Sequence, residues 1–440
     1  MVTQNSREAR SSADGVTRRQ FLRRISAAAA VAGFPTIIPS RLLGAEAPSN
    51  RITMAGIGMG GQGMSNLHSF LGNADVQWVA VCDVDSHRLA QAKRAVDEHH
   101  GNTDCVAYHD LREVIARRDI DGLLIATPDH WHAWIALNGA RAGFDIFGEK
   151  PFSHELRSGR VAVSAVERYG RVWQTGSWQR SVENFHHGCE LVRNGRIGKV
   201  VRVEVGLPDG KPGPARPPIA PPETLDWDMW LGPAPEQPYR GVSHWDWRWV
   251  MDWGGGQLLD WIGHHLDIAH WALDLDRTGP VQVKGVGTFP QSGFFDAPTA
   301  YRVECNYANG VQITVANASQ LEMGMGTRWL GEDGRWVHVD RNRQSTNPAS
   351  LWFDIIGPEE TKLYLSRDHH RNFLDCVKSR RLTIAPAEVA HRSASVGHLG
   401  LISIITGRTL RWDPATESIA DDPGATALLG RAHRQPWGLV

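Results

Sequence analysis

Two short segments combine residue types that suit proton transfer. Lys150 follows Glu149 in a Glu-Lys-Pro segment, and Asp260 stands four residues before His264. On a helix this spacing places both side chains on one face, where the carboxylate would orient the imidazole and raise its pKa. A lysine can act as acid or base when burial or a neighbouring cation lowers its pKa. We therefore expect Lys150, Asp260 and His264 to be catalytic.

Plainer interpretations of the same residues stay open. A lysine in a loop is commonly solvated, and a helical histidine is commonly a hydrogen-bonded core residue. A metal site built from His264, His265 and Asp267 is a weaker hypothesis, because adjacent histidines point to different faces of a helix. We expect no metal ion.

A glycine run near the start of the first apolar region has the pattern of a dinucleotide-binding loop. Its cofactor-binding residues would be Gly56, Gly58, Met59, Gly60 and Gly61. Glycine is needed there for a tight turn, for close approach of the backbone to a pyrophosphate, and for helix packing. The run follows a predicted strand and precedes a predicted helix, and this context makes the pattern specific.

Asp83 closes the next predicted strand and would complete this cofactor site. Its carboxylate would accept hydrogen bonds from a ribose 2′-hydroxyl and repel a 2′-phosphate. We therefore expect NAD, while Arg88, which could reach a phosphate, keeps NADP open.

The elements around this loop alternate between strand and helix. We expect strands at 51–57, 76–82, 122–126, 144–147 and 171–175, and helices at 86–100, 132–142 and 154–169. This alternation predicts an α/β Rossmann domain, whose parallel sheet binds ligands at the carboxyl ends of its strands. Thr127, Pro128 and His130 follow the third strand, and Glu149 and Lys150 follow the fourth, so we expect all five to bind cofactor.

The second half has a different pattern. Hairpin signals occur at Asn309-Gly310 and Asp333-Gly334, and 208–222 is a proline-rich loop. Strands are expected at 199–207, 281–289, 301–307, 311–316, 328–330 and 335–339, and helices at 254–273, 368–379 and 387–405. We expect an α+β domain with a large, mostly antiparallel open sheet and helices on one face.

The composition of the chain favours a small-molecule partner over nucleic acid. The chain has 440 residues and a formal net charge of −1, which predicts two domains and gives no basic field for nucleic acid. Its five cysteines are scattered, so we expect buried thiols rather than a disulfide framework or a zinc site. Its 18 tryptophans pack a core or line a cleft that stacks on sugars.

The N-terminal segment matches a twin-arginine (Tat) signal. Arg18 and Arg19 precede an alanine-rich apolar stretch, which is too short for a membrane span and is interrupted by Pro35. We expect a signal peptide at 1–47, a Rossmann domain at 48–175 and a substrate-binding and oligomerisation domain at 176–440. The Tat machinery exports folded proteins, so we expect a periplasmic enzyme with tightly bound NAD and no integral membrane segment after cleavage.

These residues together resemble the Gfo/Idh/MocA oxidoreductases, and among them the Tat-exported branch. The resemblance rests on the glycine loop with Asp83, the segments 127–132 and 149–151, and Asp260 with His264. Further matches are the segments 176–180, 226–233 and 434–437. The family implies that Lys150 lies beside the nicotinamide and the substrate hydroxyl, that Asp260 and His264 bind substrate and transfer a proton, and that the open sheet pairs subunits into a dimer or tetramer. We also expect Trp178, Arg180 and His265 to contact substrate.

Three functions are compatible with this resemblance. The favoured one is an NAD(P)-dependent oxidoreductase that transfers hydride between the cofactor and a sugar or polyol carbon. The alternative is an NAD-dependent glycoside hydrolase working by a redox-elimination cycle, which needs no carboxylate pair. The third is a binding protein that keeps the fold without catalysis, against which Lys150, Asp260 and His264 argue.

Overall fold

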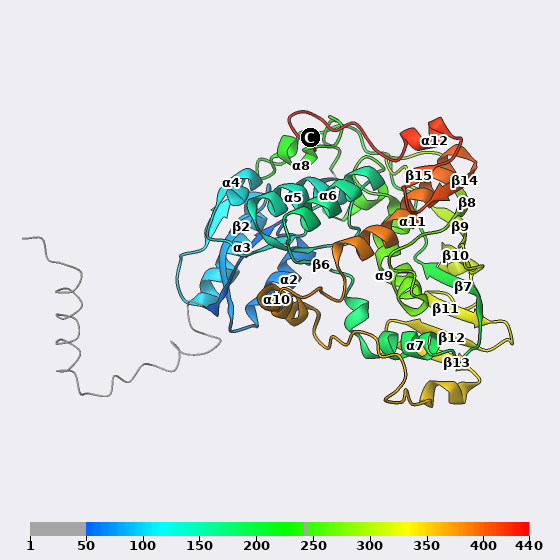
Figure 1. Cartoon of the computed structure of the whole chain (residues 1–440). Helices are drawn as coiled ribbons and strands as arrows, with labels where there is room; N and C mark the ends of the chain where they lie inside the picture. The colour runs from blue at the N-terminus through cyan, green and yellow to red at the C-terminus, as the bar shows by residue number, and fades with distance from the viewer. Residues whose placement is uncertain (1–49, 242–244, 440) are drawn as a thin grey trace, which may run out of the picture. The chain divides into compact units, whose positions relative to one another are not determined.

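The alternating apolar runs of the first half form one parallel sheet (Figure 1). The computed structural model describes residues 50–241 and 245–439, so the predicted signal peptide at 1–47 lies outside the described residues. The strand order is β3-β2-β1-β4-β5-β6, and every neighbouring pair is parallel. The strands are β1 Ile52–Ile57, β2 Val76–Cys82, β3 Val106–Tyr108, β4 Gly122–Ile125, β5 Asp145–Gly148 and β6 Trp173–Thr175. The predicted Rossmann sheet is confirmed.

Helices cover both faces of this sheet and bury an apolar cluster on each side. They are α2 Gly61–Leu71, α3 Ser86–His100, α4 Leu111–Ala116, α5 Asp129–Ala142 and α6 Leu156–Arg168. Helix α5 begins at Asp129, before the predicted start at 132, because Pro128 precedes its first turn in extended conformation. Strand β3 was not predicted because it has only three residues and its side chains are largely exposed.

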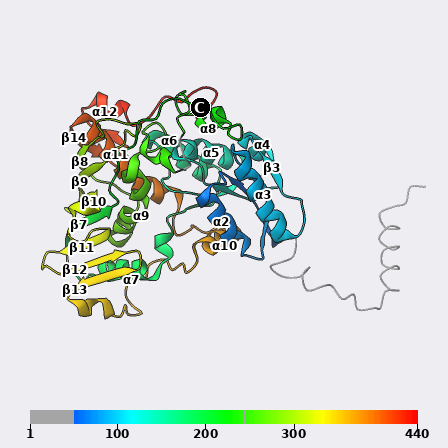
Figure 2. The same ribbon diagram turned by 180° about the vertical axis from the view of Figure 1, so that it is seen from behind.

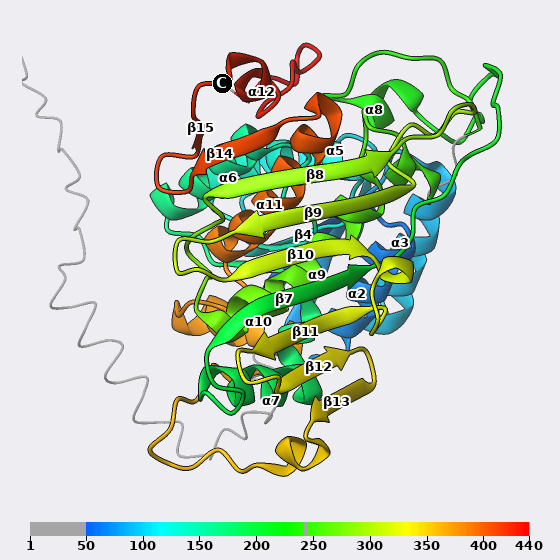
Figure 3. The ribbon, with the colours of Figure 1, turned by 90° about the vertical axis from the view of Figure 1, so that its right-hand side faces the viewer.

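The second half forms a nine-stranded sheet, with order β13-β12-β11-β7-β10-β9-β8-β14-β15 (Figure 3). Strands β7 and β10 pair in parallel, and the other neighbours pair antiparallel. The strands are β7 Val200–Leu207, β8 Gln282–Thr288, β9 Ala300–Asn306, β10 Gln312–Asn317, β11 Gly326–Gly331, β12 Trp336–Asp340, β13 Arg343–Asn347, β14 Thr409–Asp413 and β15 Ser418–Ile419. This confirms the expected large, mostly antiparallel sheet.

Three long helices pack on one face of this sheet and leave the other face open (Figure 3). They are α7 Glu183–Arg193, α9 Gly256–Leu273 and α11 Ala387–Thr406. Helix α7 was not predicted. Helix α10, His369–Ser379, returns to the first half and packs beside α2 (Figure 1, Figure 2). Both sheets belong to one unit of contacts, Arg51–Val440.

Short helices complete the second half. They are α8 Trp227–Leu231 and α12 Pro423–Ala427, with the 3-10 turns η3 Trp178–Ser181, η4 Asp246–Trp249, η5 Ala318–Gln320 and η6 Ala349–Phe353. All five cysteines are free and buried, as expected. Within 50–241 and 245–439, no helix is both long enough and apolar enough to cross a membrane.

Helix α9 is the central element for the site because it is buried nearly all round yet carries many polar residues. Its buried polar side chains are Asp260, His264, His265, Asp267 and His270. Buried charges are costly unless they are paired or bind a ligand. The partners of these residues therefore separate structural from functional roles.

Candidate active site

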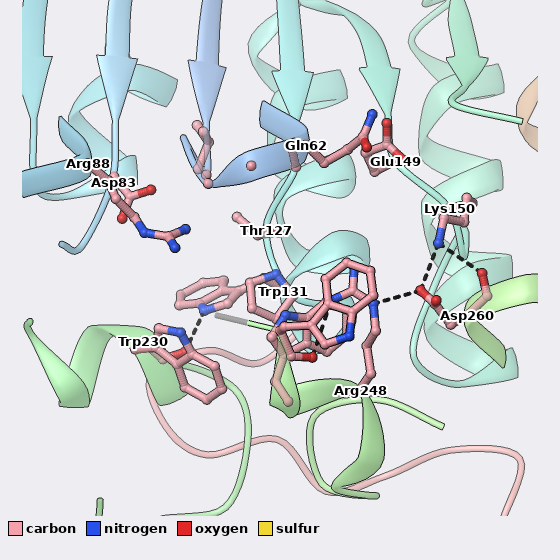
Figure 4. Close-up of a pocket in the computed structure, with 18 of the residues that line it drawn as sticks. Gln62, Asp83, Arg88, Thr127, Trp131, Glu149, Lys150, Trp230, Arg248 and Asp260 are labelled. Carbon is pink, nitrogen blue, oxygen red and sulfur yellow. Dashed lines mark hydrogen bonds and ion pairs between the residues drawn. The ribbon is translucent and has the colours of Figure 1, made fainter. Parts of the chain in front are cut away.

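A cavity of about 670 Å³ lies at the carboxyl ends of the parallel strands (Figure 4). The first half contributes the glycine loop and residues that follow β2, β4 and β5. The second half contributes α9, the turns η3 and η4, and the β12–β13 turn. The predicted site residues that line it are Gly58, Gly60, Gly61, Asp83, Thr127, Pro128, Glu149, Lys150, Trp178, Asp260 and His264.

The glycine loop fits a dinucleotide phosphate. Gly58 has a φ of +87°, and a Cβ there would lie 2.7 Å from the backbone of Ala126, so only glycine suits this position. Helix α2 begins directly after Gly60, and among the described side chains none caps its first turn. A Cβ at Gly61 would meet nothing within 4 Å. The uncapped N–H groups of this helix therefore face open space, where a phosphate would bind.

Two predicted loop residues support the cofactor site without lining it. The side chain of Met59 is buried, and its backbone N–H donates to Asp83 at 2.7 Å. Gly56 lies under the ring of Trp78, where a Cβ would approach to 2.8 Å. The structure therefore places Met59 and Gly56 against the sheet core, beside the cavity lining, and their contact with cofactor stays a prediction.

Asp83 ends β2 at the cavity wall. Its second oxygen accepts from the Asp85 N–H at 2.9 Å, and burial raises its pKa against the pull of these hydrogen bonds. Arg88 also lines this end of the cavity, beside Gly60. An acidic group at the end of the second strand is the arrangement that binds a ribose hydroxyl.

His130, predicted to contact cofactor, is buried beside the cavity and does not line it. Its Nε2 lies 3.0 Å from the Trp230 carbonyl and its Nδ1 lies 3.4 Å from the Trp253 carbonyl. Burial lowers its pKa to about 4. His130 therefore joins the first half to the tryptophan-rich segment, whereas its neighbour Trp131 lines the cavity.

Glu149 is buried beside the glycine-loop helix. Its Oε1 accepts from the Asn66 amide at 2.8 Å, and burial raises its pKa although Lys150 and Asn66 oppose the shift. Glu149 also lines the cavity.

Lys150, Asp260 and Arg248 form one charge cluster at the cavity wall (Figure 4). The Lys150 ammonium donates to Asp260 Oδ1 at 2.7 Å and to the Asp260 carbonyl at 2.9 Å. Arg248 Nε donates to the same Oδ1 at 3.0 Å. Burial would raise the pKa of Asp260, but the two cations outweigh it and hold that pKa below its usual value. Asp260 is therefore an ionised anchor.

Asp260 and His264 line the same cavity, but the predicted hydrogen bond between them does not form. Asp260 turns to Lys150 and Arg248, while His264 Nδ1 has no hydrogen-bond partner among residues 50–241 and 245–439. Burial, followed by the charges of Lys150 and Arg341, lowers the pKa of His264 well below its usual value. The imidazole is consequently neutral, where a raised pKa was expected.

Arg180 and His265, both predicted to contact substrate, are not among the residues that line the cavity. Arg180 is 2% exposed and pairs with Asp267 at 2.6 Å and with Asp276 at 2.9 Å. His265 is fully buried, stacks on Trp261, and burial lowers its pKa to about 3. Asp267 is thus already engaged, and the described part of the chain contains no group of three metal-ligating side chains.

Sequence reasoning missed two cations of the site, Arg248 and Arg341. Arg248 lies in a stretch of alternating tryptophans, 245–249, a signal that was attributed to packing and sugar stacking. Arg341 sits in the two-residue turn between β12 and β13, where a single arginine carries no motif. The tryptophans divide between the two positions: Trp253 and Trp249 are core, while Trp178, Trp247 and Trp261 line the cavity.

Two family models match most of the chain. Residues 51–177 match an oxidoreductase-family NAD-binding Rossmann fold, and residues 213–439 match the C-terminal alpha/beta domain of the Gfo/Idh/MocA oxidoreductases. The rhizopine catabolism protein MocA of Rhizobium meliloti is 23% identical over 331 residues, which are 75% of this chain and 84% of that protein.

Other similarities are partial or concern the fold alone. A glycosyl hydrolase family 109 protein of Shewanella sp. is 29% identical over 159 residues, about a third of either chain (34% and 33%). The WlbA dehydrogenase of Bordetella pertussis, solved with NADH and UDP-GlcNAcA, is 17% identical with a TM-score of 0.61, covering 82% of this chain and 99% of that chain. With both of its halves matched, the chain belongs to the Gfo/Idh/MocA family of NAD-binding oxidoreductases.

Proposed function

We propose that this oxidoreductase acts on a sugar or polyol, moving a hydride between a hydroxyl-bearing carbon and the nicotinamide. The observation that carries the proposal is Lys150, whose ammonium is held by two oxygens of Asp260 at the wall of the cofactor cavity. An ammonium has three N–H donors. With two directed to Asp260, the third is available to a substrate oxygen.

The residues of the cavity divide the work of such a reaction. When bound, the dinucleotide supplies hydride acceptance or donation. Lys150 gives a proton to the carbonyl oxygen in the reducing direction and takes it from the hydroxyl in the oxidising direction. Ionised Asp260 holds Lys150 in place, and neutral His264 can hydrogen-bond a substrate hydroxyl without adding charge. Two buried oxygens of the cavity, Thr127 Oγ1 and Gln257 Oε1, have no hydrogen-bond partner among the described residues. Both can therefore bond to groups of a ligand.

The direct test adds a polyol and aldose panel to purified protein with NAD and follows the nicotinamide absorbance. We expect at least one sugar to reduce the cofactor, and Lys150→Met to abolish the signal while still binding NAD. If the protein binds no cofactor and no sugar reduces NAD, the proposal is contradicted.

We further propose Tat export to the periplasm with NAD retained in the site. The support is the twin-arginine segment at Arg18 and Arg19. Free NAD is scarce outside the cytoplasm, so a retained cofactor must be recycled. One sugar would lose a hydride and a proton, and a second would gain both, with no net NADH. Fractionation of cells expressing the wild type and an Arg18→Lys/Arg19→Lys variant tests export. Denaturing the periplasmic protein and assaying released NAD tests retention, and an empty site would contradict it.

A redox-assisted glycoside hydrolase is the second candidate, supported by the partial similarity to glycosyl hydrolase family 109 proteins. The product distinguishes the two functions. A hydrolase releases the aglycone of a glycoside without net NADH, whereas a dehydrogenase leaves the glycosidic bond intact. Chromatography of a glycoside incubated with the NAD-loaded protein decides between them.

We propose that the open face of the nine-stranded sheet pairs subunits into a dimer or tetramer. Outward-facing residues of β8 include Val286, which is 57% exposed. Light scattering during size-exclusion chromatography gives the mass, and a monomer at all concentrations would contradict this proposal.

A further inference from the structure

Arg341 is a guanidinium that two tryptophan rings hold at the cavity wall. Its Cζ lies 4.7 Å from the ring centroid of Trp178 and 4.4 Å from that of Trp261. The turn between β12 and β13 positions it, and the side chain lines the cavity. A guanidinium stacked between aromatic faces keeps its edge free for in-plane hydrogen bonds.

The terminal nitrogens of Arg341 are not used within the described part of the chain. Gln179, with its amide oxygen turned toward Arg341, accepts from Nε at 3.2 Å. The adjacent carboxylate, Asp340, accepts the backbone N–H of Arg341 at 2.7 Å and lies 3.4 Å from Arg343. The cavity carboxylate Asp260 is occupied by Lys150 and Arg248. Arg341 thus has no ion-pair partner among residues 50–241 and 245–439.

Arg248 provides an internal comparison. Its guanidinium also stacks on tryptophans, at 4.0 Å from Trp245 and 4.3 Å from Trp247, but Asp260 neutralises it. Arg341 has the same aromatic setting without the carboxylate. Both line one cavity, so the difference indicates that the missing anion comes from a ligand.

The charge balance of the cavity agrees. Its cationic lining residues are Arg88, Lys150, Arg248 and Arg341, and its acidic ones are Asp83, Glu149 and Asp260. Burial raises the pKa of both Asp83 and Glu149. Asp129, buried behind Asp260, has its pKa raised well above its usual value by burial and by Asp260. An excess of positive charge in a partly buried cavity favours an anionic occupant.

The cofactor phosphates do not account for this excess at Arg341. The phosphate loop and Arg88 belong to the first half of the chain, around Gly58–Gly61. Arg341 instead contacts Trp178 and Trp261, on η3 and on the helix that carries Asp260 and His264. Its ligand therefore lies on the substrate side.

Building on the proposed sugar oxidoreductase function, we infer that the substrate is a sugar acid or sugar phosphate whose oxyanion pairs with the terminal nitrogens of Arg341. Lys150 then meets the reacting hydroxyl elsewhere on the same molecule. The planar fork of an arginine matches a carboxylate or phosphate in two parallel hydrogen bonds, which fix orientation as well as charge.

Isothermal titration calorimetry of the NAD-loaded protein tests this without requiring turnover. The probes are D-glucuronate, D-galacturonate, D-gluconate and D-glucose 6-phosphate, each matched with D-glucose, D-galactose or D-glucitol. We expect one anionic probe to bind about 10- to 100-fold more tightly than its neutral counterpart. The carboxylate and phosphate arms separate the two sources of the oxyanion.

Variants assign the preference to Arg341. Arg341→Met should remove the preference for the anion, and Arg341→Lys, which keeps charge without the fork, should retain part of it. Arg343→Met is the matched control, because Arg343 is on the same hairpin, has a side chain 64% exposed, and lies outside this cavity. It should leave the preference unchanged, and thermal melts confirm that each variant is folded.

The outcomes separate this inference from the proposed function. If neutral sugars bind and are oxidised as well as their acids, or if Arg341→Met keeps the preference, the inference is overturned while the oxidoreductase function stands. If neither class binds and neither reduces the cofactor, both are overturned.

Discussion

Helix α9 carries two buried aspartates, Asp260 and Asp267, which are seven residues apart. The ion-pair clusters around them differ in net charge, and only the cluster of Asp260 lines the cavity. At Asp260, one carboxylate serves two cations, Lys150 and Arg248, at the cavity wall. At Asp267, one guanidinium, Arg180, serves two carboxylates away from the cavity.

The two clusters differ in whether their cation keeps an N–H donor that is not already hydrogen-bonded. Every nitrogen of the Arg180 side chain is bonded to Asp267 or Asp276, and Ser393 donates to Asp267 at 3.0 Å. Lys150 keeps one N–H beyond its two bonds to Asp260. Buried charge alone therefore does not mark a candidate reacting group, and the spare donor of Lys150 at the cavity is what supports its proposed role.

Removing Lys150 should give the largest effect on catalysis. We expect Lys150→Met to lower kcat by roughly 10²- to 10⁴-fold, the usual contribution of a positioned acid or base. The fold should persist, because Arg248 still pairs with Asp260. Single-turnover kinetics and NAD titration measure both quantities. Near-normal kcat in a folded variant would assign the proton transfer to another group.

Removing Arg180 should instead affect stability. Arg180→Met would leave buried Asp267 and half-buried Asp276 without their cation, and we expect the free energy of unfolding to fall by about 3–5 kcal/mol. Catalysis per folded molecule should change little, because Arg180 does not line the cavity. Urea unfolding, with kcat measured on the folded fraction, tests the contrast with Lys150. An Arg180→Met/Asp267→Asn double variant should recover part of the stability, and additive losses would argue against a shared cluster.

Removing Arg248 should change how kcat/KM and stability depend on pH. Arg248 is one of two cations that lower the pKa of Asp260, so Arg248→Met should raise that pKa. As the solution is acidified, Asp260 of the variant would be protonated at a higher pH than in the wild type. The stability that the ionised carboxylate contributes above its unfolded pKa would be lost at that higher pH as well. We expect the acid limb of log kcat/KM to move to higher pH. Arg335→Met, at a surface pair with Asp333, should leave the profile in place.

The smallest effect belongs to Ser393, which donates one hydrogen bond to Asp267. Ser393→Ala should cost about 1 kcal/mol of stability and leave kcat unchanged, because Arg180 still neutralises Asp267. Thermal unfolding measures the loss. A fall in kcat at constant stability would mean that the Asp267 cluster is coupled to the cavity.

Local sequence patterns were sufficient for the Rossmann half and its loop. The alternation of strands and helices, the turn at Gly58 and the position of Asp83 after β2 follow from apolar periodicity and from glycine at a backbone conformation that other residues rarely adopt. The order of the strands within the sheet came only from the structure. Strand β3 and helix α7 were missed because their apolar patterns are short or interrupted.

The sequence by itself determined which half binds the dinucleotide and that Asp260 and His264 lie on one helix, since motif and spacing are local properties. Only the family resemblance implied that Lys150 shares their site, and the structure places all three at one cavity. Only the tertiary structure decided their roles. Lys150 and Asp260 are 110 residues apart, and Arg341 reaches the cavity from a hairpin without a motif. Hydrogen-bond partners and pKa values depend on burial and on charges brought together from distant segments. For that reason His264 is neutral and not hydrogen-bonded to Asp260, and Arg180 pairs with Asp267 away from the cavity lining.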